Sequence, residues 1–228
     1  MKIFCYNKKM TETDYITKTA KYIKEKFIGE GSGHDWWHMY RVWQLSKLIC
    51  KTEGHANHLV VELAALLHDI DDWKFNDGDM EAGPKAAREW LVSINVSEDI
   101  IEQVEEIIRK VSYKGAGVAS NIKTIEGKIV HDADKIDAIG AIGIARVFAY
   151  GGSISREIYD PSVKPTLHKT FHEYMNDNKT SSINHFYEKL LLLKERIYTA
   201  TGKQIAESRH QYMEKYLIEF YKKWDGEA

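Results

Sequence analysis

The sequence predicts an all-α protein, and three observations support this prediction. Apolar residues recur at three- and four-residue spacing along most of the chain. No stretch of convincing length alternates apolar and polar side chains as a half-buried strand would. The 228 residues include only 3 Pro, and 43% of them are hydrophobic, so the chain can bury a full core without long low-complexity linkers.

The first expected helix covers residues 11–27 and stops at a glycine-rich stretch. Asp35 is expected to cap a second helix that runs to about Lys51. Asn57 opens the third, whose sequence HLVVELAALLHDI is apolar on nearly every face after its first turn. A helix of this kind is expected to be deeply buried at its C-terminal end.

The next elements alternate short loops with amphipathic helices. A loop over residues 78–84 precedes a helix over 85–93, and a second helix over 97–111 begins with a capping serine. After a glycine-containing loop near residues 115–120, the helical period continues without a break over 124–150. The small residues of this last segment would allow close helix packing.

The C-terminal part is expected to contain one long irregular loop followed by long helices. Residues 151–182 combine paired glycines, two prolines and Asn/Asp clusters, which indicates a surface or lid loop. Residues 183–224 are amphipathic with helical period, and Gly202 is the expected position of a break. The apolar face of these helices could pack on the bundle or on a second copy of the chain, so a homodimer is left open.

We expect one domain over residues 11–228, with the site in a core at about 30–150, after an extension over residues 1–10. The formal charge of −2 and pI of about 6.6 provide no overall attraction for nucleic acid or an anionic membrane. Two cysteines are too few for a disulfide framework, and no apolar run approaches the length of a membrane span. A cytoplasmic location follows as the expectation.

Three His-Asp dipeptides occur in the chain, at residues 34–35, 68–69 and 131–132. Chance predicts roughly 0.6 such pairs for this composition, so their number is only suggestive. The pair His68-Asp69 follows the most apolar segment, where an imidazole and a carboxylate need a partner to offset their desolvation. A divalent cation would satisfy both groups. The alternative is a solvated helix end.

Two other expected helices carry polar groups on the same pattern. His38 is followed three residues later by Arg41, and Asp134 and Asp137 repeat that spacing. Imidazoles and carboxylates together suit a six-coordinate divalent ion such as Mn²⁺, Mg²⁺, Fe²⁺, Co²⁺ or Ni²⁺ better than a Cys-rich zinc site. The candidate ligands are His38, His68, Asp69 and Asp134.

The segments HDWWHMYRV, LLHDI and DADKIDAIG resemble the H…HD…D signature of the HD-domain superfamily of metal-dependent phosphohydrolases. Four further segments look like a bacterial subgroup of stand-alone HD hydrolases: HDIDDWKF, the GG…IYDP loop, SSINHFYEKLLLLKERIYT and RHQYMEKYLIEF. That subgroup includes nucleoside triphosphate pyrophosphohydrolases. The resemblance runs from about His34 to the C-terminus.

The resemblance implies an HD-domain helical bundle, with the long loop and the C-terminal helices packed on it. It also implies one divalent ion, Mn²⁺ first among the five above, held by the four candidate ligands. Within DADKIDAIG the ligand is Asp134 and not Asp132, because family ligands precede the Lys-x-Asp step. Asp137 would support the ligands from behind, and Arg41 is expected to orient a ligand carboxylate.

The resemblance further implies two catalytic residues. Asp69 would act through the ion, and Asp72, one turn later, would be the general acid or base; Asp71 is an equally available acid. A bound ion lowers the pKa of water, and nearby cations hold the polyphosphate in line for attack. The candidate substrate contacts are Lys74, Lys114, Lys135 and His34.

The function that follows is hydrolysis of nucleoside or deoxynucleoside triphosphates to monophosphate and pyrophosphate, with a small-molecule nucleotide as partner and neither nucleic acid nor membrane. A nucleotide phosphomonoesterase and a non-catalytic nucleotide or metal sensor are the alternatives, and a purely structural helical protein is the third. A cyclic-dinucleotide phosphodiesterase of the HD-GYP kind is disfavoured, because the chain contains no GYP and only His131 lies between the His68-Asp69 pair and Asp134. A guanosine tetraphosphate hydrolase would share the signature but not the C-terminal segments.

Overall fold

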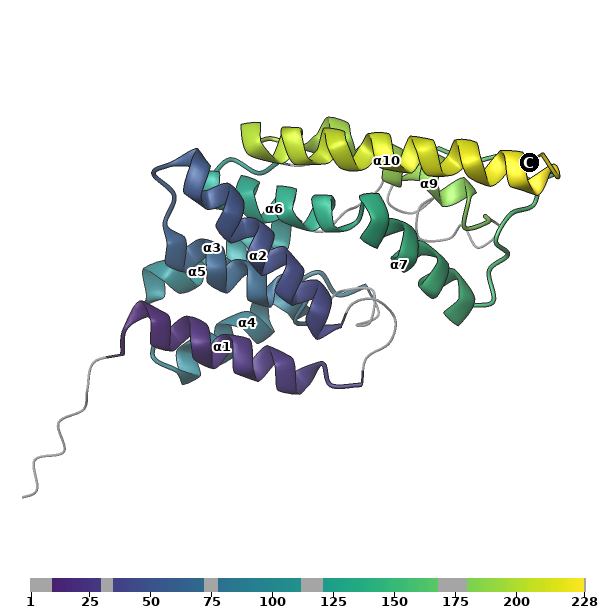
Figure 1. Cartoon of the computed structure of the whole chain (residues 1–228). Helices are drawn as coiled ribbons and strands as arrows, with labels where there is room; N and C mark the ends of the chain where they lie inside the picture. The colour runs from purple at the N-terminus through teal and green to yellow at the C-terminus, as the bar shows by residue number, and fades with distance from the viewer. Residues whose placement is uncertain (1–9, 30–34, 72–77, 112–120, 168–179, 228) are drawn as a thin grey trace, which may run out of the picture.

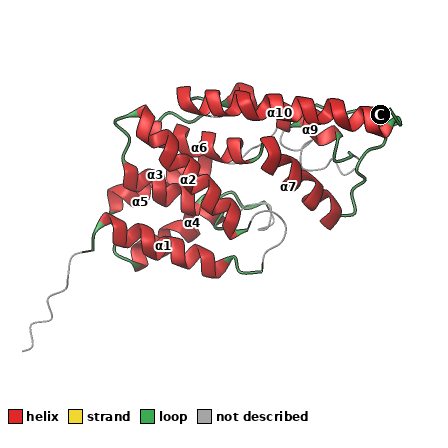
Figure 2. Ribbon diagram, viewed as in Figure 1, coloured by secondary structure: helices red, strands yellow, loops and turns green. Residues whose placement is uncertain are grey.

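The structure, a computed structural model, describes residues 10–29, 35–71, 78–111, 121–167 and 180–227. Within these residues every regular element is a helix (Figure 2), which confirms the expected all-α class. In the same part of the chain, no helix combines the length and the apolarity that a membrane span requires.

The helices follow one another in the order shown in Figure 1, coloured from purple to yellow. The N-terminal ones are α1 (Glu12–Lys26), α2 (Trp36–Glu53), α3 (His58–Leu67), α4 (Ala82–Ser93) and α5 (Glu98–Val111). The C-terminal ones are α6 (Ile125–Asp137), α7 (Gly140–Ser153), α9 (Asn184–Glu188), the 3₁₀ helix η2 (Leu190–Arg196) and α10 (Ala200–Trp224).

Helix α3 forms the centre of the N-terminal bundle. All its residues except His58 and Glu62 are buried, and it packs against α1, α2, α5 and α6. Each fully buried Leu or Val contributes about 1.5–3 kcal/mol relative to an exposed one. The expected burial of this segment is therefore confirmed. It carries His68, the C-cap residue of α3, into the interior at only 4% exposure.

Short polar side chains fix the first turns of the helices that carry the candidate ligands. Asp35 accepts a hydrogen bond from the His38 backbone N–H at 2.9 Å and caps α2. Asn57 caps α3, and Thr124 caps α6 through its hydroxyl. The caps predicted at Asp35 and Asn57 are confirmed.

The expectation of one unbroken helix over residues 124–150 is wrong. Helix α6 ends near Ala138, Ile139 is extended, and α7 starts at Gly140, whose φ of +77° suits glycine. A Cβ at Gly143 would lie 2.2 Å from the Ala138 carbonyl oxygen. The two glycines therefore allow a tight corner between two helices.

Two other expected boundaries also need correction. Helix α4 begins at Ala82 rather than residue 85, because a proline is tolerated in the first turn, where backbone N–H groups have no helical partner. Helix α7 continues through Gly151 to Ser153, so the irregular segment begins at residue 154 and not 151. A Cβ at Gly151 would lie 2.4 Å from Ser182 Oγ, so this glycine serves close packing.

The expected break at Gly202 is wrong as well. The chain passes from η2 through an extended Ile197, and Thr199 then caps α10, which runs unbroken through Gly202. The Thr199 hydroxyl accepts a hydrogen bond from the Gly202 N–H at 3.1 Å, and a Cβ at Gly202 would lie 2.5 Å from it. The glycine makes room for the cap of the helix.

Helix α10 is the longest helix of the described chain and lies along the bundle (Figure 1). It packs against α2, α6, α7 and η2. Aromatic rings join it to its neighbours, since Phe186 stacks on Tyr216 at 5.9 Å between centroids and Phe148 packs on both. The C-terminal helices are thus packed on the bundle as expected. The single-domain assignment stays a prediction, and residues 1–9 lie outside the described chain.

Candidate metal centre

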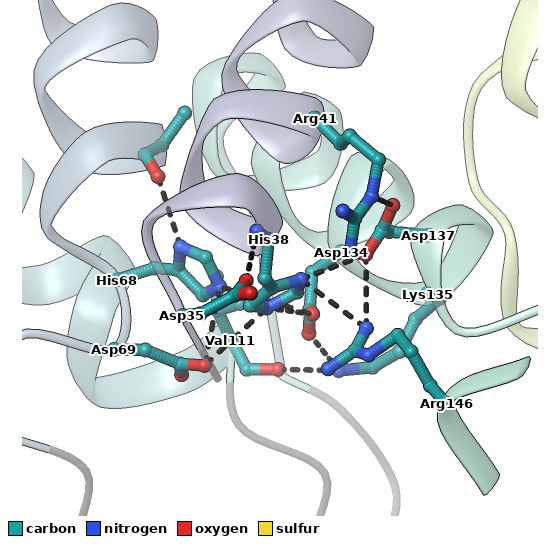
Figure 3. A network of polar contacts seen from close by, with 11 residues as sticks. Asp35, His38, Arg41, His68, Asp69, Val111, Asp134, Lys135, Asp137 and Arg146 are labelled. Carbon is teal, nitrogen blue, oxygen red and sulfur yellow. Dashed lines mark hydrogen bonds and ion pairs between the residues drawn. The ribbon is translucent and has the colours of Figure 1, made fainter. Parts of the chain in front are cut away.

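The four candidate ligands come from three helices that meet at one point. His38 lies in the first turn of α2, His68 ends α3, Asp69 follows it, and Asp134 lies on α6. The structure brings all four side chains together, as Figure 3 shows. His38 and His68 are buried, whereas Asp69 and Asp134 keep 10% and 20% of their side chains exposed.

The ligand atoms lie within reach of one another. His38 Nε2 is 3.2 Å from His68 Nε2, 3.4 Å from Asp69 Oδ2 and 3.6 Å from Asp134 Oδ1. His68 Nε2 is 3.6 Å from Asp69 Oδ2 and 3.8 Å from Asp134 Oδ1. Ligands that share one ion at about 2.1 Å, at right angles or tetrahedral angles, lie roughly 3.0–3.4 Å apart. The 3.2 and 3.4 Å separations fall in this range, and the other three, at 3.6–3.8 Å, are slightly wider.

Hydrogen bonds on the far side of each imidazole fix which nitrogen faces the centre. His38 Nδ1 lies 2.8 Å from Asp137 Oδ2, and His68 Nδ1 lies 2.9 Å from the Ala65 carbonyl oxygen. Both partners accept hydrogen bonds, so the network assigns the proton of each ring to Nδ1. Nε2 is then an acceptor on both rings.

The donor set fits a divalent cation. Each imidazole Nε2 lies within 4 Å of the other and of one oxygen from each carboxylate, and His38, His68 and Asp69 form the tightest group; acceptors this close repel one another unless a positive charge lies between them. Metal-binding histidines commonly have their other ring nitrogen hydrogen-bonded to a carboxylate or a carbonyl, which sets the tautomer, and both imidazoles here have such a bond. The residues present therefore suit the ion that the sequence predicts.

The electrostatics of the site favour positive charge at its centre. Burial and the Arg146 charge lower the pKa of His38, but the Asp137 and Asp69 carboxylates beside its two ring nitrogens raise it more, so the net direction is upward. Burial raises the pKa of Asp134, but the positive charge of Lys135 and the two imidazoles lower it by more. The pKa of Asp134 is therefore far below the usual range for an aspartate. Asp134 is thus ionised at neutral pH.

Asp137 lies behind His38 and organises that side of the site. Arg41 donates to both of its oxygens, at 2.7 Å from Nε and 3.0 Å from Nη2, and Arg146 donates from Nη1 at 2.9 Å. Burial raises the pKa of Asp137, but its bonds to His38 and Arg41 hold that pKa well below its ordinary value. The structure places Asp137 behind His38, whereas Arg41 contacts Asp137 and not a ligand carboxylate; the supporting role of both residues stays a prediction. Arg146, on α7, is a residue that sequence reasoning missed.

Lys135 is buried beside Asp134. Its ammonium donates to Asp134 Oδ2 at 2.8 Å and to the Val111 carbonyl oxygen at 2.9 Å. These contacts hold the Asp134 carboxylate with its other oxygen toward the histidines. The role of Lys135 as a phosphate contact stays a prediction, because the contacts seen here orient a ligand.

Several predicted site residues cannot be placed. Asp72, the candidate general acid or base, and the substrate contacts His34, Lys74 and Lys114 all lie outside the described residues. Their roles stay predictions. The alternative acid, Asp71, is described, and its carboxylate lies 3.1 Å from Lys26 Nζ in an ion pair.

The pair His131-Asp132 does not join the cluster. The Asp132 carboxylate accepts hydrogen bonds from the Tyr198 and Thr199 backbone N–H groups and from the Thr199 hydroxyl, at 2.7–3.0 Å. His131 packs edge-on against Tyr198, and burial lowers its pKa. The structure thus uses Asp132 to hold the C-terminal segment, while Asp134 faces the histidines.

Comparison with known proteins places the chain in a family. A model of the HD domain matches residues 36–139, which include all four candidate ligands. The Bacillus subtilis protein YpgQ is 33% identical over 218 residues, 95% of this chain and 97% of YpgQ. A crystal structure of an HD-superfamily hydrolase from Bacillus thuringiensis is similar at 40% identity and a TM-score of 0.72, covering 94% of this chain and 99% of that one. The chain therefore belongs to the HD superfamily and is a hydrolase.

One solved relative contains a nucleotide. The crystal structure of Bacillus subtilis YpgQ in complex with ADP is similar to this chain with a TM-score of 0.71 and 32% identity, covering 91% of this chain and 97% of that one.

Proposed function

We propose that this hydrolase is a divalent-metal-dependent phosphohydrolase that converts nucleoside or deoxynucleoside triphosphates to monophosphate and pyrophosphate. The observation that carries the proposal is the meeting of four acceptor atoms, from His38, His68, Asp69 and Asp134, in a chain of the HD superfamily. The ADP complex of the relative YpgQ supports a nucleotide as the ligand.

We assign one divalent ion to these four residues. Mn²⁺ is the first candidate, and Mg²⁺, Co²⁺, Ni²⁺ and Fe²⁺ are also compatible with a mixed nitrogen and oxygen donor set. When bound, such an ion would lower the pKa of a water molecule and neutralise negative charge on the phosphoryl oxygens.

The chain's own groups bind and orient the reactants. The water oxygen forms a bond to the α-phosphorus, the bond from that phosphorus to the bridging oxygen breaks, and pyrophosphate leaves. We assign to Asp72 the role of the carboxylate that accepts the proton of the attacking water. We assign substrate binding to Lys74, Lys114 and His34. The small formal charge of −2 supports a free nucleotide rather than nucleic acid as substrate, and a cytoplasmic location is part of the proposal.

The experiment that tests this function is a substrate panel with separate detection of the two products. Nucleoside mono-, di- and triphosphates and p-nitrophenyl phosphate are incubated with Mn²⁺, Mg²⁺, Co²⁺ or Ni²⁺, and pyrophosphate is resolved from phosphate. Pyrophosphate from a triphosphate is the expected result. Phosphate alone, from monophosphates or the generic ester, would replace the proposal by a phosphomonoesterase. Nucleotide binding without turnover, with metal bound, would replace it by a sensor.

A variant separates binding of the ion from proton transfer. Asp72→Ala is expected to lower turnover while the protein keeps its metal, because the role of Asp72 does not include holding the ion. Full turnover in this variant would overturn the assignment of the acid.

A further inference from the structure

Asp137 accepts more hydrogen bonds than its charge requires. Its Oδ2 atom lies within 2.8–3.0 Å of three donors, which are His38 Nδ1, Arg41 Nη2 and Arg146 Nη1. A carboxylate oxygen offers two lone pairs, so three donors crowd it. The two-point contact with Arg41 already matches the single negative charge of Asp137. Arg146 is the donor in excess.

The positive charge of Arg146 therefore lacks a carboxylate of its own. Within the described residues, Asp137 is the one carboxylate within 4.0 Å of its guanidinium, and only Nη1 of the group donates to it. The Arg146 side chain is 20% exposed, so the charge is largely removed from water but still reachable. Burying a cation without a matched anion is costly, and an anionic ligand would offset that cost.

The surplus charge lies next to the candidate metal centre. Arg146 Nη1 is 3.2 Å from His38 Nδ1, so a single imidazole ring separates the guanidinium from the nitrogen that faces the ion site (Figure 3). A second arginine adds to the charge on this side. Arg209 of α10 donates to the Ile136 carbonyl oxygen at 2.6 Å; burial lowers its pKa, and the Asp137 charge acts in the opposite direction.

We infer that Arg146 is a substrate-binding residue that holds the terminal phosphates of a polyphosphate chain whose α-phosphate lies at the ion. This inference rests on the proposed function, since it takes the leaving group to be pyrophosphate. A guanidinium presents its donors in a planar fork that matches phosphate oxygens, and four of the five N–H groups of Arg146 are not used by Asp137. The ligand chemistry that fits is a di- or polyphosphate anion.

The test measures pyrophosphate binding rather than turnover. Titration calorimetry follows inorganic pyrophosphate and inorganic phosphate binding to the metal-loaded wild type, Arg146→Gln and Arg146→Lys. Arg146→Gln is expected to weaken pyrophosphate binding about tenfold to a hundredfold, the loss of one or two charge-assisted hydrogen bonds, and to change phosphate binding much less. Arg146→Lys keeps the charge but not the fork, and an intermediate loss is expected.

A matched control comes from α4. The Arg88 side chain is 35% exposed, more than the 20% of Arg146, and pairs with Glu98 and Glu105, so Arg88→Gln removes a partly exposed arginine from ion pairs that involve no candidate ligand. It is expected to bind pyrophosphate like the wild type. Metal content and thermal midpoint are measured for every variant, because a purely structural Arg146 would lower these and weaken both anions equally.

The pyrophosphate titration tests the role of Arg146, and the substrate panel tests the proposed function, so either can fail without the other. Unchanged pyrophosphate binding in Arg146→Gln, or equal losses for phosphate and pyrophosphate, would overturn the inference even if the wild type cleaves triphosphates. Selective loss of pyrophosphate binding supports the phosphate contact, and the substrate panel then decides independently whether triphosphates are cleaved.

Discussion

Two regions of this chain contain the same dipeptide and use it in opposite ways. His68-Asp69 ends α3 with His68 Nε2 and the Asp69 carboxylate near two further acceptors, His38 Nε2 and Asp134 Oδ1. In His131-Asp132, on α6, the carboxylate is surrounded by donors from Tyr198 and Thr199. Both pairs are buried or nearly so. The residue types and the burial therefore do not distinguish a metal centre from a structural contact.

The partners distinguish them. A buried carboxylate that accepts several N–H and O–H groups is already satisfied and has little to gain from an ion. A buried carboxylate that faces the Nε2 atoms of two imidazoles is stabilised by a cation placed between these atoms. In the remaining His-Asp dipeptide, at residues 34–35, Asp35 has a third role, because its carboxylate caps helix α2. The following substitutions test this contrast, from the largest expected effect to the smallest.

Replacing His68 or Asp69 by Ala should have the largest effect on activity. Loss of a direct ligand is expected to weaken metal binding by more than the 10–100-fold that supporting residues typically cost, and turnover should fall to background. Metal content by atomic emission and hydrolysis of the best substrate in the panel are the measurements. A His68→Ala protein with full metal content and full rate would contradict the metal centre.

Asp132→Ala should act on stability instead. It leaves the Tyr198 and Thr199 donors without their acceptor, and we expect the free energy of unfolding to fall by about 3 kcal/mol. Urea denaturation measures the loss, and bound metal per chain should stay at the wild-type value. Asp132→Asn is the control, since it keeps one oxygen acceptor and should lose less. Metal loss with unchanged stability would reverse the contrast between the two dipeptides.

Asp137→Asn should weaken metal binding without abolishing it. The substitution removes the charge that holds His38 in its tautomer and that pairs with Arg41, and outer partners of this kind contribute about 10–100-fold in affinity. Competition with a fluorescent chelator measures the change. An affinity equal to the wild type would show that Asp137 does not support the ligand.

Asp35→Ala should have the smallest effect. It removes the cap of α2, which is worth about 1 kcal/mol of stability, and leaves all four candidate ligands in place. Thermal unfolding with and without metal measures the loss. A change in metal content as large as that of Asp69→Ala would show that this dipeptide also belongs to the centre.

The sequence was sufficient where the signal is local. The burial of α3 follows from its composition, and the caps at Asp35 and Asn57 follow from residue type and position. The four candidate ligands came from residue types and spacing, the family resemblance favoured Asp134 over Asp132, and the structure brings the four side chains together. Arg146 could not have been found in this way, because it lies 108 residues from His38 and reaches it only through the corner at Gly140.

The glycines show a second limit of sequence reasoning. Gly140 does end one helix and begin another, whereas Gly151 and Gly202 lie inside helices. At both interior positions a Cβ would lie within 2.5 Å of a hydroxyl of another residue. A glycine that ends a helix and a glycine that makes room for a packed neighbour look the same in the sequence, and they are distinguished by the residues that surround them in the structure.

Helix α6 has a fixed rotation about its own axis. Asp132 and Asp134 are two residues apart and therefore point in directions that differ by about 200°. One is fastened to the C-terminal segment and the other faces the histidines. The family match ends at residue 139, so an excised fragment of that length would contain every candidate ligand but lack the Thr199 anchor that sets the angle of α6. We therefore expect the isolated segment 36–139 to hold Asp134 toward the histidines less firmly than the whole chain does.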